Sequence, residues 1–149
     1  MKVTAVLVVA GVAALAAGNA GPERGPGAGR TVWDGVFTEA QAKRGEKVYA
    51  AKCVNCHLDT FLGDGTATAL TGPGFLANWD GVLIGEMVDR TRSTMPDDDP
   101  GTLSRQQVAD VLAFVLKFNK FPAGETELPT QAEALNQITF VATKAEGTQ

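Results

Sequence analysis

The chain has 149 residues, of which 44% are hydrophobic and 20% charged, and its formal net charge is −4 at pH 7. This acidic balance argues against nucleic-acid binding, which needs a positively charged surface. The length is that of one globular domain, and the sequence contains no internal repeat.

The first residues have the pattern of an export signal. Lys2 precedes an apolar stretch from Val3 to Ala17, and the small residues Gly18-Asn19-Ala20 follow. A basic start, a short apolar core and a small-residue end predict a signal peptide over residues 1–20, cleaved after Ala20. The stretch is shorter than the roughly 20 residues that span a bilayer, so an uncleaved anchor is the alternative. We expect a periplasmic or otherwise exported protein.

The composition then changes twice along the chain. Residues 21–31 are rich in Gly and Pro, which is typical of a flexible leader rather than a folded element. We expect one domain over residues 32–141 and a disordered tail over residues 142–149.

Two segments carry strong helix signals. Thr38 and Gln41 form a capping box, which predicts a helix over 39–52, and Ser104 and Gln107 form another before a helix over 105–118. In the second helix, apolar side chains recur at helical spacing from Val108 to Phe118.

Three further segments have weaker patterns. The apolar residues of Trp79 to Arg92 predict a shorter helix, and a third capping box at Thr130 to Glu133 predicts a helical turn ending at Asn136. Ile138 to Val141 is expected to be extended. No run resembles a hairpin, so the predicted fold class is all-α.

The run Cys53-Val54-Asn55-Cys56-His57 has the CxxCH spacing of covalent c-type haem attachment. Cysteines three positions apart lie about one helical turn apart, so their sulfurs can reach the two vinyl groups of one porphyrin. His57 then supplies the proximal iron ligand. It is the only histidine of the chain, so bis-histidine ligation within the chain is impossible and one haem c is expected.

Three other uses of this motif are weaker. A redox dithiol is expected in a βαβ context, which the sequence lacks. A zinc site needs about four ligands, and the run offers three. A disulfide between cysteines three positions apart closes too small a loop to stabilise much.

The sixth iron ligand must come from a residue other than histidine. After the predicted signal, the only methionines are Met87 and Met95. Met87 follows Leu83 and Ile84 at helical spacing, which favours core packing. Pro96 excludes Met95 from a helix and ends the preceding element, so Met95 on a stiffened loop is the predicted ligand. A loop methionine that fills a gap is the alternative.

Together these features resemble the class I cytochromes c, over Phe37 to Asn119. The resemblance rests on the CxxCH motif and on matches in family order: Gly45 and Tyr49 before it, then Gly72-Pro73, Met95-Pro96 and Phe114. It implies about four helices around one haem and a close crossing of the first and last helices at Gly45. It also implies that the carbonyl of Pro73 accepts a hydrogen bond from the proximal His57.

A narrower resemblance concerns the partner. Val32 to Phe37, Met95 to Ser104 and Phe121 to Gly124 are similar to bacterial exported cytochromes c that are often associated with quinoprotein (PQQ-dependent) dehydrogenases. This implies a quinoprotein dehydrogenase as electron donor and a terminal oxidase or another cytochrome as acceptor. Trp79 is a candidate for packing on the haem or for donating its indole N–H to a propionate, and packing in the core without that bond is the alternative.

The expected function is therefore the carriage of single electrons by a haem iron held between His57 and Met95, and not catalysis. Two alternatives place Met95 away from the iron, which would leave the sixth position open. One is a peroxidase-like haem enzyme, and the other is a sensor of gas or redox state.

Overall fold

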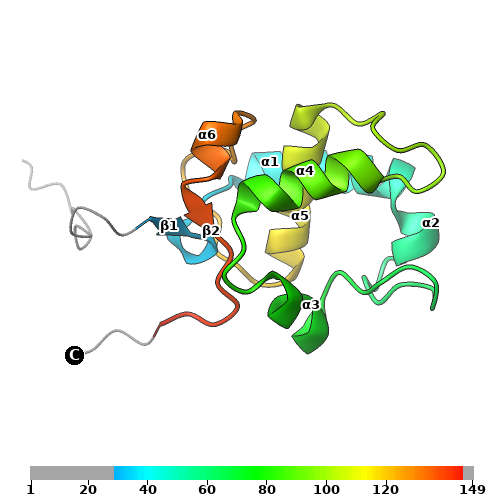
Figure 1. Ribbon diagram of the computed structural model, residues 1–149, viewed down its shortest axis with the longest axis horizontal. Helices are drawn as coiled ribbons and strands as arrows, with labels where there is room; N and C mark the ends of the chain where they lie inside the picture. The colour runs from blue at the N-terminus through cyan, green and yellow to red at the C-terminus, as the bar shows by residue number, and fades with distance from the viewer. Residues whose placement is uncertain (1–28, 146–149) are drawn as a thin grey trace, which may run out of the picture.

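The computed structural model describes residues 29–145. The predicted signal peptide, residues 21–28 of the leader and residues 146–149 of the tail lie outside this range. The described part is mostly helical, and the all-α class is confirmed (Figure 1). Its helices are α1 (Glu39–Lys52), α2 (Val54–His57), α3 (Gly72–Trp79), α4 (Ile84–Thr94), α5 (Arg105–Phe118) and α6 (Ala132–Leu135).

Helices α1 and α5 form the most extensive helix contact within residues 29–145. Gly45 is buried at this crossing. A Cβ atom built on Gly45 would lie 1.8 Å from the carbonyl oxygen of Asp110 and 3.0 Å from Cβ of Phe114. The two backbones can approach this closely only because residue 45 has no side chain. The crossing expected at Gly45 is confirmed.

Helix α1 begins as predicted, but its capping box is incomplete. The side chain of Thr38 accepts a hydrogen bond from the backbone N–H of Gln41 at 3.1 Å. The fully buried side chain of Gln41 does not return to Thr38. Instead, its amide donates to the carbonyl of Leu128 and its oxygen accepts from the backbone N–H of Leu128, at 3.0 and 2.7 Å. Gln41 thus joins α1 to the C-terminal segment.

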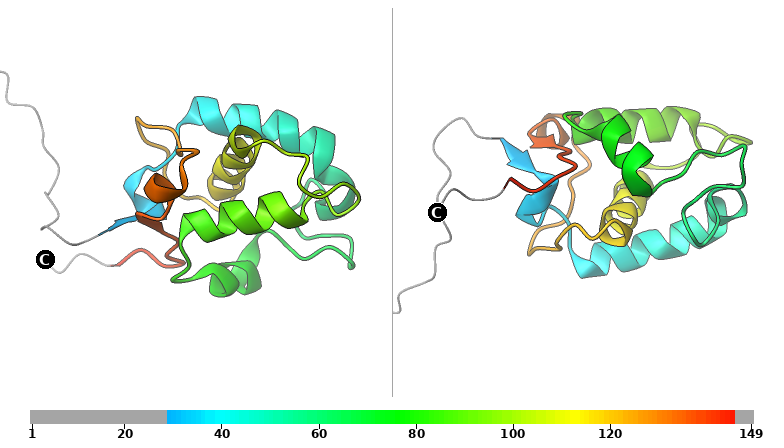
Figure 2. Two further views of the ribbon diagram at one scale, coloured as in Figure 1. Left: turned by 45° about the horizontal axis from the view of Figure 1, so that its top comes forward. Right: turned by 90° about the horizontal axis from the view of Figure 1, so that it is seen from below.

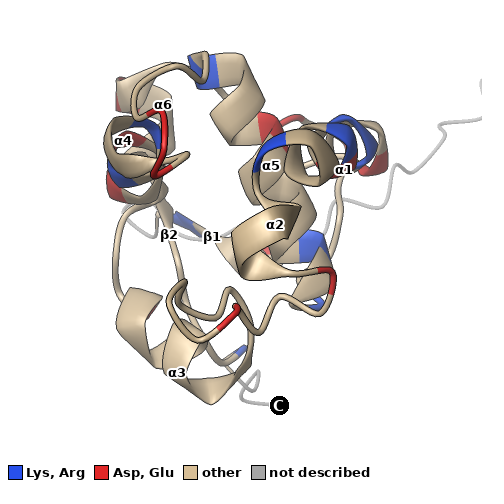
Figure 3. Ribbon diagram, turned by 90° about the vertical axis from the view of Figure 1, so that its right-hand side faces the viewer, with Lys and Arg blue, Asp and Glu red and all other residues tan. Residues whose placement is uncertain are grey.

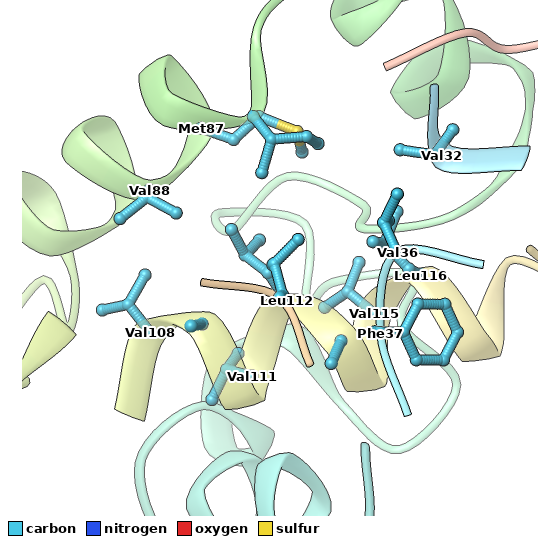
Figure 4. Packing of buried hydrophobic residues seen from close by; sticks show 14 of the residues in the cluster. Val32, Val36, Phe37, Met87, Val88, Val108, Val111, Leu112, Val115 and Leu116 are labelled. Atoms are coloured by element: carbon cyan, nitrogen blue, oxygen red, sulfur yellow. The ribbon is translucent and has the colours of Figure 1, made fainter. Parts of the chain in front are cut away.

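Helix α5 supplies the centre of the core. Its predicted capping box is complete, because Ser104 and Gln107 each accept a hydrogen bond from the other's backbone N–H. Several of its buried side chains face α4 and the segment around Val36, as Figure 4 shows, whereas Val111 lies on the other side of the helix. Those labelled in the figure are Val108, Val111, Leu112, Val115 and Leu116.

The helix expected from Trp79 to Arg92 is confirmed from Ile84 onward, but its predicted start is wrong. Helix α3 ends at Trp79, and α4 begins only at Ile84. Gly81, with a φ of +80°, lies in the turn between them. A positive φ favours glycine, so Gly81 permits the turn that separates the two helices. The sequence reading overlooked α3 because its start contains Gly-Pro-Gly, although proline is well tolerated in the first turn of a helix.

The two ends of the described chain meet at one end of the molecule. Strand β1 (Arg30–Thr31) pairs in parallel with β2 (Ile138–Thr139), and the short 3-10 helix η1 (Val32–Asp34) follows β1 directly. Figure 2 shows these elements at the end opposite α2. Arg30 and Thr31 therefore belong to the domain and not to the leader, because they pair with a strand more than 100 positions later.

The C-terminal segment is also ordered beyond the last long helix. Helix α6 begins after Gln131, without a side-chain cap, so the capping box expected at Thr130 is wrong. The extended piece expected at Ile138 is confirmed as β2. Ala142, which was assigned to the tail, packs against the core and donates its backbone N–H to Asp80 at 2.8 Å.

Candidate functional site

The cysteines of the motif lie where α1 passes into the single turn α2. Cys53 ends α1 by donating its backbone N–H to the carbonyl of Tyr49 at 2.8 Å, and the N–H of His57 then bonds to the carbonyl of Cys53 at 2.9 Å. Cys53 is half-buried and Cys56 is exposed, and both thiols are free. Figure 3 shows α2 between α1 on one side and α3 and α4 on the other.

The described residues lend no support to the three other uses of the motif. The two cysteines are not joined in a disulfide. Burial, with a smaller effect of Cys56, raises the pKa of Cys53 to about 11, whereas redox dithiols need a readily formed thiolate. Within residues 29–145, no group of three or more His, Cys, Asp or Glu side chains is placed to hold a metal ion by itself.

His57 is oriented by one hydrogen bond. Its side chain is buried, and its Nδ1 lies 2.9 Å from the carbonyl oxygen of Thr68. A carbonyl only accepts, so Nδ1 carries a proton, and in the neutral ring Nε2 then has the lone pair that binds a metal. A histidine that ligates a metal almost always donates its other ring N–H in this way.

The partner of His57 corrects one expectation. Thr68, not Pro73, provides the carbonyl. Pro73 lies in the first turn of α3, where a carbonyl is directed along the helix axis towards the N–H four residues later. Thr68 could not be found from the sequence because every residue has a backbone carbonyl, and the side chain of Thr68 takes no part in this bond.

The loop between α2 and α3 is shaped by unusual backbone angles. Leu58 and Phe61 have φ values of 60° and 61°, a region that residues other than glycine rarely adopt. The hydroxyl of Tyr49 donates to the carbonyl of Leu58 at 2.7 Å, and burial raises the pKa of Tyr49 to about 12. These contacts fix the chain immediately after His57.

Phe61 anchors the same loop in an aromatic cluster. Its ring is stacked on Tyr49 with centroids 4.4 Å apart and on Phe118 with centroids 3.8 Å apart, and Phe114 packs edge-on against it. Phe61 is 2% exposed. The cluster joins α1, the loop and α5, so the segment that carries Thr68 is tied to the helix crossing.

The two methionines occupy different environments. Met87 is 2% exposed on α4 and belongs to the core, near Val88 in Figure 4. Met95 is half-buried and follows the last residue of α4 with extended backbone angles, φ −121° and ψ 149°, directly before the buried Pro96. The expected core role of Met87 and the expected release of Met95 from the helix are both confirmed.

Trp79 ends α3 and is half-buried against the core. The guanidinium carbon of Arg90 lies 5.6 Å from the centre of its ring, a cation–π contact that joins α3 to α4. The packing of Trp79 on a haem stays a prediction.

The fold and the motif define a class I c-type cytochrome, a small helical domain around one covalently attached haem. Residues 40–115 match the family model described as cytochrome c oxidase, cbb3-type, subunit III. The match covers just over half of the chain, and the chain belongs to this family, whose shared unit is a cytochrome c domain. No curated protein and no solved structure matches the chain significantly.

Membership establishes a covalently bound haem c and a role in electron transport, and proteins of this kind are generally carriers rather than enzymes. The residues present fit the cofactor. Two unbridged thiols are available for thioether bonds, and the ring of His57 is held with Nε2 available to iron. Within residues 29–145, no helix has the length and apolar character required to cross a membrane.

Proposed function

We propose that this chain is an exported carrier of single electrons whose haem iron is ligated by His57 and Met95. The observation that carries the proposal is the orientation of His57, buried and held through Nδ1 by the carbonyl of Thr68. A neutral imidazole held in this way presents Nε2 to the iron as a fixed ligand.

Met95 is the best candidate for the second axial ligand. It is the one methionine of residues 29–145 that lies outside a helix, while Met87 is committed to the core. A thioether bound opposite a histidine raises the potential of the haem iron. Because both axial positions are then filled, neither peroxide nor a gas has an open site, so the enzyme and sensor alternatives are not favoured.

When bound, the haem supplies the ferric–ferrous couple. The protein's own residues hold and orient it: Cys53 and Cys56 through thioether bonds, and His57 through the hydrogen bond to Thr68. The stack of Tyr49 and Phe61 keeps the loop after His57 in place. A rigid ligand set suits a carrier, because the protein around the iron then changes little between the two oxidation states.

The partners are other redox proteins. The narrower sequence resemblance supports a quinoprotein dehydrogenase as donor, and a terminal oxidase or another cytochrome as acceptor. The three carboxylates Asp97, Asp98 and Asp99 are exposed two to four positions after Met95, which supports a partner with a basic surface. The signal pattern of residues 1–20 supports a periplasmic location.

Replacement of the two methionines tests the ligation. Met95→Ala should abolish the near-infrared sulfur-to-iron charge-transfer band of the ferric protein, lower the potential and admit external ligands to the iron. Met87→Ala should keep the band and lower the free energy of unfolding by about 2–5 kcal/mol, as expected when a buried methionine is truncated. Absorption spectra and denaturant unfolding measure both effects.

The two variants act as controls for each other. A band lost in Met87→Ala and kept in Met95→Ala would reverse the assignment. A high-spin spectrum of the parent protein that responds to added ligands would instead favour the enzyme or sensor alternative.

A further inference from the structure

Asn119, the residue that ends α5, connects this helix to the loop that orients His57. Its side-chain amide donates to the carbonyl of Leu70 and to the carbonyl of Val115, both at 2.9 Å. Its side-chain oxygen accepts a hydrogen bond from the hydroxyl of Thr71 at 2.9 Å. Because both partners of the amide are carbonyl oxygens, the assignment of nitrogen and oxygen in this side chain is fixed.

The hydroxyl of Thr71 does not cap α3. Thr71 is the N-cap residue of α3, yet its side chain accepts no hydrogen bond from the first turn of that helix. A threonine cap is typically worth about 1 kcal/mol to a helix. The hydroxyl instead donates to Asn119, and this bond ties the start of α3 to the end of α5.

The segment held by Asn119 lies next to the carbonyl that orients His57. Thr68, which accepts from the ring, is two positions before Leu70, and the backbone N–H of Leu70 bonds to the carbonyl of Phe61 at 2.8 Å. On its other side, Thr68 is preceded by a turn in which Asp64 accepts from the N–H of Ala67. The chain is therefore fixed by hydrogen bonds both before and after Thr68, and Asn119 fixes the part after Thr68 by attaching Leu70 and Thr71 to the end of α5.

We propose that Asn119 is a positioning residue that sets the reduction potential of the haem through Thr68 and His57. This inference rests on the proposed ligation of iron by His57. A strong hydrogen bond from Nδ1–H to a carbonyl raises the basicity of the ligating imidazole, which stabilises ferric relative to ferrous iron. A change that weakens the hydrogen bond between Nδ1–H and the carbonyl of Thr68 should therefore raise the reduction potential of the haem.

The test uses neutral variants, so that no new charge acts on the iron. Asn119→Ala should raise the potential and accelerate hydrogen exchange at Nδ1 of His57, followed by NMR of the ferric protein. Thr71→Val, which removes only one of the three hydrogen bonds, should give smaller changes in the same directions. Thr71→Ser keeps the hydroxyl and should restore both values to those of the parent.

Asn78→Ala is the matched control, because Asn78 is exposed on α3 and should leave both quantities unchanged. Parent-like exchange and potential in Asn119→Ala would overturn the inference. If Asn119→Ala does not fold, parent-like exchange and potential in Thr71→Val would overturn the inference. A parent protein without the low-spin spectrum and sulfur-to-iron band would refute the proposed function instead, so the two failures are distinguishable.

Discussion

At the scale of single residues, Gly45 shows how the absence of one side chain permits the close crossing of α1 and α5. A glycine within a helix costs about 1 kcal/mol relative to alanine, and nothing local in α1 explains it. The reason lies 65 positions later, where the carbonyl of Asp110 fills the space that a Cβ would occupy. The same crossing brings Tyr49 beside Phe114, with ring centroids 5.5 Å apart.

Gly45→Ala and Gly45→Val should therefore destabilise the haem-containing protein. Backbone atoms cannot move aside as a flexible side chain can, so overpacking should cost about 1–3 kcal/mol for alanine, and more for valine. Denaturant unfolding measures the change. Glu46→Ala, at an exposed position of the same helix, should be neutral or slightly stabilising. Variants of Gly45 that match or exceed the parent in stability would show that the crossing does not exist.

At the scale of elements, the end of α5 is a Schellman motif without its usual glycine. The N–H of Phe121 bonds to the carbonyl of Leu116 at 3.1 Å and the N–H of Lys120 to that of Lys117 at 3.0 Å, which is the hydrogen-bond pattern of this motif. Lys120 occupies the left-handed position, with a φ of 69°. A side chain there costs roughly 1–2 kcal/mol.

Lys120→Gly should consequently stabilise the protein. Relief of the left-handed strain outweighs the extra chain entropy of glycine, roughly 0.5–1 kcal/mol, so a gain of up to about 1 kcal/mol in the free energy of unfolding is expected. Lys47→Gly provides the matched control at an exposed position inside α1, where the same change should destabilise by roughly 0.5–1 kcal/mol. Equal losses in the two variants would argue against the motif.

At the scale of the whole molecule, the family match ends at residue 115, but the core does not. Leu128, Leu135, Ile138 and Phe140 are 0–1% exposed. The ring of Phe140 packs edge-on against Phe75 and Phe121. The C-terminal segment, residues 128–140, is thus part of the domain, and its side chains complete the hydrophobic core at the end opposite α2.

Phe140→Ala tests whether the packing of the C-terminal segment on the core stabilises the domain. Loss of the ring from a closed core should lower the free energy of unfolding by about 3–5 kcal/mol, while the haem spectrum of the folded protein stays that of the parent, because the change lies at the opposite end. Gln137→Ala is the control, since an exposed substitution usually stays within ±0.5 kcal/mol. If both variants unfold at the same denaturant concentration, the segment is not part of the cooperative unit.

Local signals explain what the sequence by itself determined. The spacing of Cys53, Cys56 and His57 indicated haem c, and the caps at Thr38 and Ser104 located both long helices, because each signal is complete within a few residues. The release of Met95 from α4 followed from Pro96 for the same reason. Local patterns also misled at the start of α4, where the apolar residues Val82 and Leu83 were assigned to the helix although it begins only at Ile84, after the turn at Gly81.

Only the tertiary structure decided which distant groups meet. The carbonyl of Thr68 holds His57, the carbonyl of Asp110 excludes a side chain at Gly45, and Gln41 brackets the backbone of Leu128, 87 positions later. Thr68 and Asp110 take part through their carbonyls, and Leu128 takes part through both its carbonyl and its N–H. Every residue has a backbone carbonyl, so the amino-acid type at a position does not show whether its carbonyl will be a partner. The path of the folded chain alone decides which carbonyl lies within hydrogen-bond distance.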